Sequence, residues 1–245
     1  MNQHRTSAEL KAYAKGTLIG KYGTAIAALI VIQLIVQGII FLTSSAINQN
    51  TISGILIYYL ILVIITLITA VFSVGQISLY LNMASNQPYK VSNVFDGFKK
   101  HPDKAIVIQF LIFAISLGAM LPAGILGVIC IISEKYVLLM AVALLAIAGI
   151  VTAYFFLFRF SQAFYMILDF PDYTVKELLS LSNDIMKGNC GRLFYITISF
   201  IPLSLLGLLS CGIGFLYIIP YQNMTMTYFY LDLIKCRENN QTSVI

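Results

Sequence analysis

Long uncharged stretches dominate this chain and alternate with short segments that hold nearly all of its lysines and arginines. No Asp, Glu, Lys or Arg occurs in residues 22–89, 105–133, 136–158 or 193–231. A helix needs roughly 20 apolar residues to cross ~30 Å of hydrocarbon. The first and last stretches are long enough for two crossings each, and the other two hold one each. The pattern therefore predicts an all-α integral membrane protein with six transmembrane helices.

The six expected spans cover residues 24–46, 53–80, 105–132, 136–158, 193–209 and 215–233. Pro122 lies inside the third span and Pro220 inside the sixth. We expect a helix kink at each, because proline removes a backbone donor. Ser44 and Ala46 resemble a small-residue cleavage site, which leaves a signal peptide as an alternative for the first span. A retained helix is favoured, because its apolar core exceeds the roughly 7–15 residues of a signal peptide.

Composition supports the same class of protein. Hydrophobic residues make up 59% of the 245 residues and charged residues only 10%, whereas a soluble domain carries about 25% charged residues. So few charges cannot cover a surface that faces water. The formal charge of +5 would indicate nucleic acid only if the basic residues gathered on one folded face. They flank apolar runs instead, so no nucleic-acid partner is expected.

The basic residues also predict an orientation. Placing the amino terminus inside the cell puts residues 1–23, 82–104, 159–192 and 235–245 in the cytoplasm, and these segments hold 14 of the 15 lysines and arginines. This asymmetry is typical of cytoplasmic loops. We expect a cytoplasmic interfacial segment over residues 1–23, one membrane domain over residues 24–234, and a cytoplasmic tail over residues 235–245.

Two of the cytoplasmic connections have the spacing of an amphipathic helix followed by lysines. We expect both to lie on the inner leaflet, with their apolar side chains and lysines in contact with membrane lipid. The expected lipid contacts are Val91, Val94, Phe95, Phe98, Lys99 and Lys100 in the first connection, and Val175, Leu178, Leu179 and Lys187 in the second.

The lead-ins to these connections correspond as well. Gln76 precedes Pro88 in one, and Gln162 precedes Pro171 in the other. This suggests a duplicated unit of span, interfacial helix and span, with copies over residues 73–118 and 158–206. The alternative is that any connection on the inner leaflet must be basic and amphipathic. Both interpretations remain open.

A family resemblance begins at the second connection. It is carried there by Tyr165, Asp169, Pro171, Ser180, Met186 and Gly188, and later by Gly212-Ile213-Gly214, Pro220-Tyr221 and Tyr228-Phe229-Tyr230. These residues are spaced as in an uncharacterised family of multi-pass bacterial membrane proteins. That family is catalogued as a domain of unknown function and is common in Firmicutes. The resemblance implies a bacterial plasma membrane and roughly six spans, and it carries no established activity.

Catalytic chemistry finds little support. No ionisable residue lies well inside an expected span, which disfavours proton-coupled transport through a buried carboxylate. His4 and His101 both lie in cytoplasmic connections, and no His-Glu-x-x-His motif occurs. We therefore expect no enzyme activity, no metal site and no cofactor.

Side-chain amides are the main polar groups within the spans. They are Gln33, Gln37, Gln109, Gln222 and Asn223. Such groups usually hydrogen-bond between helices and contribute about 0.6 kcal/mol each. The functional alternative is a polar pocket where Pro122 and Pro220 break two helices.

Two functions follow from these patterns. The first is a non-enzymatic membrane protein that binds lipid or an amphipathic peptide, as a component of transport or envelope protection, with a membrane protein as a further candidate partner. The second is a small permease that moves a neutral or amphipathic solute through the amide pocket.

Overall fold

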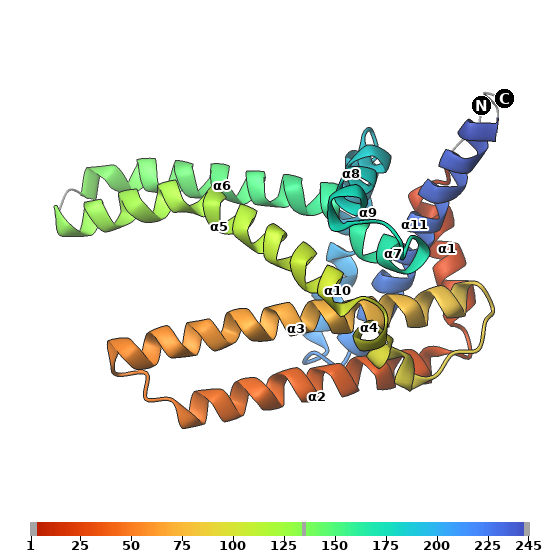
Figure 1. The fold of residues 1–245 in the computed structure, drawn as a ribbon, viewed down its shortest axis with the longest axis horizontal. Helices are drawn as coiled ribbons and strands as arrows, with labels where there is room; N and C mark the ends of the chain where they lie inside the picture. The colour runs from red at the N-terminus through yellow and green to blue at the C-terminus, as the bar shows by residue number, and fades with distance from the viewer. Residues whose placement is uncertain (1–3, 134–135, 243–245) are drawn as a thin grey trace.

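The structure is a computed structural model that describes residues 4–133 and 136–242. Every regular element in these residues is a helix. Two long helical hairpins extend in the same general direction from a common base (Figure 1). The first hairpin consists of α2 (Tyr22–Ala46) and α3 (Ile52–Ala84), and the second of α5 (Pro102–Ile132) and α6 (Leu139–Phe160). The predicted helical class is therefore confirmed.

The base is built from the remaining helices. They are α1 (Ser7–Leu18), η1 (Val91–Phe95), α4 (Asp96–Lys99), α7 (Ala163–Asp169), α8 (Val175–Met186), α9 (Cys190–Ile198), α10 (Ile201–Leu209) and α11 (Phe215–Thr242), while the short η2 (Tyr136–Leu138) precedes α6. The helix α1 begins with a capping box formed by Thr6 and Glu9, and α8 begins with one formed by Thr174 and Glu177.

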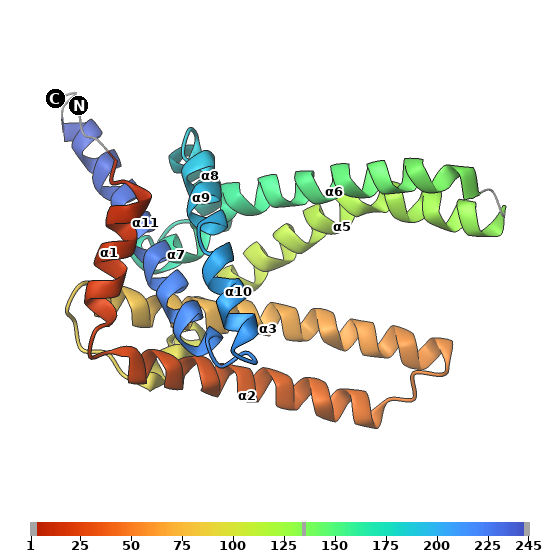
Figure 2. The same cartoon turned by 180° about the vertical axis from the view of Figure 1, so that it is seen from behind.

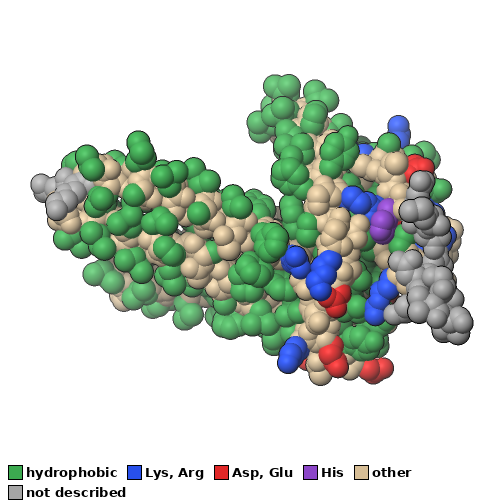
Figure 3. All heavy atoms as spheres, turned by 90° about the horizontal axis from the view of Figure 1, so that it is seen from above, with side chains coloured by type: hydrophobic (Ala, Val, Ile, Leu, Met, Phe, Trp, Pro, Cys, Tyr) green, Lys and Arg blue, Asp and Glu red, His purple; other side chains and the backbone are tan. Residues whose placement is uncertain are grey.

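Among the described residues, five helical segments are long and apolar enough to cross a membrane. They are α2, α3, α5, residues 136–169 and residues 190–209. The helix α11 is not among them, because uncharged polar residues such as Gln222, Asn223 and Thr225 interrupt its apolar run. Six crossings are therefore not confirmed. On the face in Figure 3, hydrophobic side chains cover the hairpins, and charged side chains gather over the base.

The predicted fifth span is interrupted. The helix α9 ends at Ile198 and α10 begins at Ile201, with Pro202 in its first turn. Proline has no backbone N–H, so it cannot continue the hydrogen bonds of the preceding helix. Both α9–α10 and α11 run across the direction of the hairpins in the two opposite views (Figures 1 and 2). Pro122 and Pro220 lie inside α5 and α11, as predicted.

The helix α11 joins three clusters of buried side chains in the base. Its Met224 packs with α1, α2 and α3, its Phe229 packs with α1 and α9, and its Tyr230 packs with α5, α7 and α8. All three of these side chains are fully buried. The core of the protein therefore lies in the base and not between the hairpins.

Part of the first basic connection packs on protein. Val94 is fully buried against α3, so its predicted contact with lipid is wrong. The segment forms the 3-10 helix η1 and one turn of α-helix, instead of a longer amphipathic helix. The reason is that α3 offers an apolar surface on which Val94 is buried and Val91 packs.

Part of the second basic connection also packs on protein. Leu178 is fully buried in the cluster around α7, and Val175 and Leu179 pack against that cluster. Leu178 therefore cannot contact lipid. Phe95, Phe98, Lys99, Lys100 and Lys187 are exposed, so their contact with lipid remains a prediction. The first connection folds into η1 and α4, and the second folds into α7 and α8. The predicted duplication remains untested.

Candidate functional site

The amide pocket predicted from the sequence does not form as a unit. Gln33 and Gln37 are exposed on α2, while Gln109 and Gln222 are half-buried in different helices and line no cavity described here. Asn223, by contrast, lines a cavity. The spacing of Gln33 and Gln37 does place them on one face of α2, but that face points away from the rest of the protein.

Asn223 belongs to a cavity of about 310 Å³ between α3, the junction of α6 and α7, α9 and α11. We call it the polar cavity. Its polar lining includes Ser73, Gln76, Tyr80, Gln162, Tyr165 and Thr197, and Ile77, Phe158 and Met226 are among its apolar residues. Every polar side chain of the lining is uncharged. Sequence reasoning identified Gln76 and Gln162 only as markers of the two connections.

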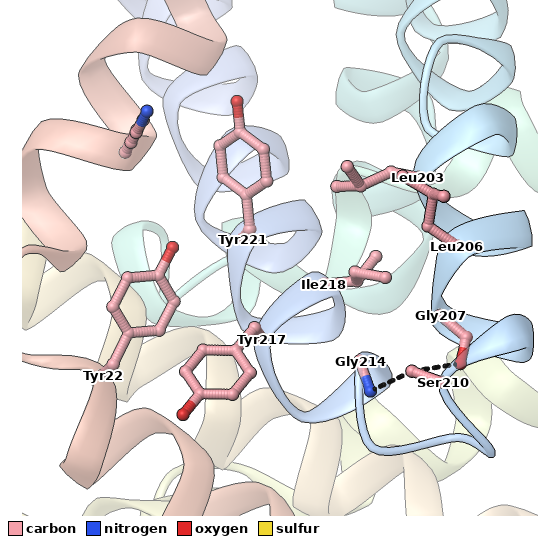
Figure 4. A pocket seen from close by; sticks show the side chains of 10 residues that line it. Tyr22, Leu203, Leu206, Gly207, Ser210, Gly214, Tyr217, Ile218 and Tyr221 are labelled. Atoms are coloured by element: carbon pink, nitrogen blue, oxygen red, sulfur yellow. Dashed lines mark hydrogen bonds between the residues drawn. The ribbon is translucent and has the colours of Figure 1, made fainter.

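A second, more open cavity of about 430 Å³ lies where α1, α2, α10 and α11 meet. We call it the tyrosine groove. Tyr22, Tyr217 and Tyr221 form one side of it, and Leu203 and Leu206 of α10 form the other (Figure 4). Lys15 of α1 also lines it. The groove therefore combines one cation and three phenol hydroxyls with an aliphatic wall.

Small residues shape the lower end of this groove. A Cβ atom at Gly214 would lie 2.8 Å from the Cα atom of Gly207, so only glycine permits α10 and α11 to approach this closely. Ser210 Oγ accepts a hydrogen bond from the Gly214 backbone N–H at 2.8 Å and donates one to the Gly207 carbonyl at 2.7 Å (Figure 4). These bonds fix the turn that positions Tyr217. The rings of Tyr22 and Tyr217 lie 5.7 Å apart.

Lys15 differs from the neighbouring lysines. Lys11 donates to the Ser199 carbonyl at 3.1 Å and lies over the Phe200 ring, and burial lowers the pKa of Lys11. Lys21 donates to the Met83 carbonyl at 3.1 Å. Within the described part of the chain, the side-chain ammonium of Lys15 has no hydrogen bond or ion pair, and the hydroxyls of Tyr22, Tyr217 and Tyr221 have no hydrogen bond. These groups are available to a ligand.

A cluster of charged side chains connects α9 and α11 to the segment that precedes α1. Arg192 donates to Asp232 at 2.8 Å and to the Arg5 carbonyl at 2.8 Å, and His4 contacts Asp232 at 3.1 Å. Cys236 lies close enough to share a metal ion with His4 and Asp232. The guanidinium beside the carboxylate disfavours a second cation there. We therefore interpret this cluster as structural.

These features define the class of the protein: a helical protein with apolar hairpins long enough to cross a membrane, and a base in which the polar cavity and the tyrosine groove lie. The family model described as "Protein of unknown function (DUF975)" matches residues 1–237, so the chain belongs to this family. The resemblance noted in the sequence is confirmed as membership of a family of unknown function. Comparison with curated proteins and with solved structures gives no match.

Proposed function

We propose that this protein is a membrane-embedded binding protein whose tyrosine groove holds an anionic phospholipid. The observation that carries the proposal is the position of Lys15, whose ammonium has no partner among the described residues and lies beside three tyrosine hydroxyls and an aliphatic wall. Lysine binds phosphate as a point charge. Tyrosine suits the boundary between headgroups and acyl chains, because its ring is apolar and its hydroxyl is polar.

The aliphatic side of the groove fits the acyl chains of a phospholipid. Leu203 and Leu206 of α10 line the groove opposite the tyrosines, and Ile218 of α11 lies between the two sides (Figure 4). An acyl chain on these residues would remove apolar surface from contact with headgroups and water. The groove volume of about 430 Å³ is that of a small-ligand site, which favours lipid over an amphipathic peptide helix.

The membrane arrangement supports this ligand. We place α2, α3, α5 and α6 across a bacterial plasma membrane and the base at its cytoplasmic face, with both termini inside. The helices α9, α10 and α11 run across the hairpins, so we place them along the inner leaflet. This arrangement has four crossings in place of six. The cytoplasmic leaflet is rich in anionic lipid, and each nearby lysine adds about 1 kcal/mol of attraction.

A binding measurement tests the proposal. The full chain, purified in detergent, would be titrated with fluorescent phosphatidylglycerol and with phosphatidylcholine of the same acyl composition. We expect saturable binding of phosphatidylglycerol, and at least roughly tenfold weaker binding for Lys15→Gln, because a charge-assisted hydrogen bond contributes about 1.5–3 kcal/mol.

Lys176→Gln is the matched control, since Lys176 is an exposed lysine on α8 outside the groove. We expect this variant to bind phosphatidylglycerol as the wild type does. Equal affinity for the two lipids, or an unchanged affinity in Lys15→Gln, would overturn the proposal.

A further inference from the structure

The polar cavity contains a hydrogen-bond acceptor that the protein does not satisfy. Gln162 is only 2% exposed, it lines the cavity, and its side-chain oxygen Oε1 has no partner in the described residues. Buried polar atoms are nearly always paired, because an unpaired one forfeits its hydrogen bond to water. A buried and unpaired oxygen in the wall of a cavity therefore indicates a ligand that donates a hydrogen bond.

Hydrogen bonding within the protein establishes which end of the Gln162 amide is free. The Ser161 hydroxyl donates its proton to the Phe158 carbonyl at 2.8 Å. Toward Gln162 it can therefore only accept, and it accepts from Nε2 at 2.8 Å. The amide nitrogen must face Ser161, which leaves Oε1 as the unsatisfied atom.

Other hydroxyls of the lining also act as acceptors. Ser73 donates its proton to the Thr69 carbonyl at 3.0 Å, and Thr197 donates to the Leu193 carbonyl at 2.9 Å. Both side chains line the cavity, and each has only lone pairs left to offer. The lining thus offers several acceptors, and the amides of Gln76 and Asn223 can also donate. Its complement is a ligand whose groups both donate and accept, as hydroxyls do.

The lining also sets the charge and the size of that ligand. It contains no charged side chain, and an ammonium group buried there would lack a counter-charge. The volume of about 310 Å³ lies at the small end of the range for ligand sites. Tyr80 and Tyr165 also line the cavity and add aromatic surface to its wall.

We infer that the polar cavity binds a small uncharged group that carries several hydroxyls. The group can be a free polyol or the sugar headgroup of a neutral glycolipid, because both present the same chemistry. This site is separate from the tyrosine groove, since no residue lines both. The inference therefore does not depend on phospholipid binding.

The test uses the full chain in detergent and two probes, radiolabelled sorbitol and a monoglucosyl diacylglycerol. Saturable binding of sorbitol would assign a free polyol. Retention of the glycolipid in native mass spectrometry, without sorbitol binding, would assign a headgroup. Either result supports the inference. Choline, a cation without hydrogen-bond donors near its charge, serves as the negative probe.

Two variants locate the binding. Gln162→Met keeps the length of the side chain and removes Oε1, and we expect at least tenfold weaker binding of the probe that the wild type takes. Thr197→Val removes one acceptor with almost no change of shape, and we expect weakening of about fivefold. Thr197→Val also keeps the inference testable if Gln162→Met fails to fold.

Gln109→Met is the control, because it changes a glutamine outside both cavities, and Lys15→Gln separates this site from the groove. We expect both to bind the probe as the wild type does. The inference fails if neither probe binds saturably and water alone fills the cavity, if choline binds more tightly, or if both cavity variants keep the wild-type affinity.

Discussion

Two glycines determine how the first connection packs on α3. A Cβ atom at Gly75 would lie 2.0 Å from the Val94 carbonyl oxygen, and one at Gly97 would lie 1.9 Å from the Val71 carbonyl oxygen. Both contacts are with backbone atoms, which cannot rotate away as a flexible side chain would. The absence of a side chain at these positions is what allows η1 and α4 to lie directly on α3.

We expect Gly75→Ala to destabilise the protein by about 1–3 kcal/mol, the usual effect of overpacking. Thermal unfolding in detergent would measure the change as a lowered Tm. Gly118→Ala is the control, because nothing lies within 4 Å of the added Cβ on α5. A Tm of Gly75→Ala equal to that of Gly118→Ala would contradict the close packing of η1 on α3.

Glu177 gives a pH dependence at the start of α8. The backbone N–H of Thr174, and then its hydroxyl, donate to the Glu177 carboxylate and hold the pKa of Glu177 below its usual 4.5. Because the folded pKa is lowered, this stabilisation is present above pH 4.5 and is lost as the pH falls through the folded pKa.

We therefore expect the Tm difference between the wild type and Glu177→Gln to shrink as the pH is lowered from 7 to below 4.5. Thermal melts of both proteins across this range would measure it. Lys176→Gln, one position earlier and outside the capping box, controls for general effects of acid. A difference that stays constant over the whole range would exclude the charged capping box.

The helices of the last uncharged stretch show what the sequence could and could not predict. Arg192 and Asp232 flank residues 193–231, and a hairpin returns its two ends to the same place. Their ion pair could therefore have been predicted from the uncharged stretch alone. The direction of that hairpin could not, because hydrophobicity indicates only that a helix is apolar. It does not distinguish crossing a membrane from lying along one.

Thiol labelling of Cys211 tests whether α10 and α11 cross the membrane or lie along it. With six crossings it would lie outside the cell, whereas our arrangement places the turn between α10 and α11 at the base, beside Tyr22. In cells that express a variant with Cys211 as its single cysteine, we expect an impermeant thiol reagent added outside to leave Cys211 unlabelled.

Asn50→Cys in a cysteine-free chain is the positive control, since Asn50 is exposed in the turn between α2 and α3. We expect it to react from outside. Labelling of Cys211 to the same extent as this control would restore the six-crossing arrangement and contradict ours.

The molecule as a whole consists of apolar hairpins and a base that holds the core, the charges and both cavities. The membrane class and the helical content follow from the uncharged stretches, and the family resemblance follows from residues of the second connection. The cavities did not follow from the sequence. Gln162, Tyr80 and Thr197 meet only because α3, α7 and α9 pack against α11, and single-chain patterns do not indicate which helices become neighbours.

Our interpretation depends most on the proposed presence of lipid in the tyrosine groove. An experimental structure of the full chain, purified with phosphatidylglycerol, would reveal it. We expect density for a phosphate within about 3.2 Å of Lys15 Nζ, with an acyl chain along Leu203 and Leu206. A groove without lipid, or a lipid whose headgroup lies away from Lys15, would contradict the proposed function.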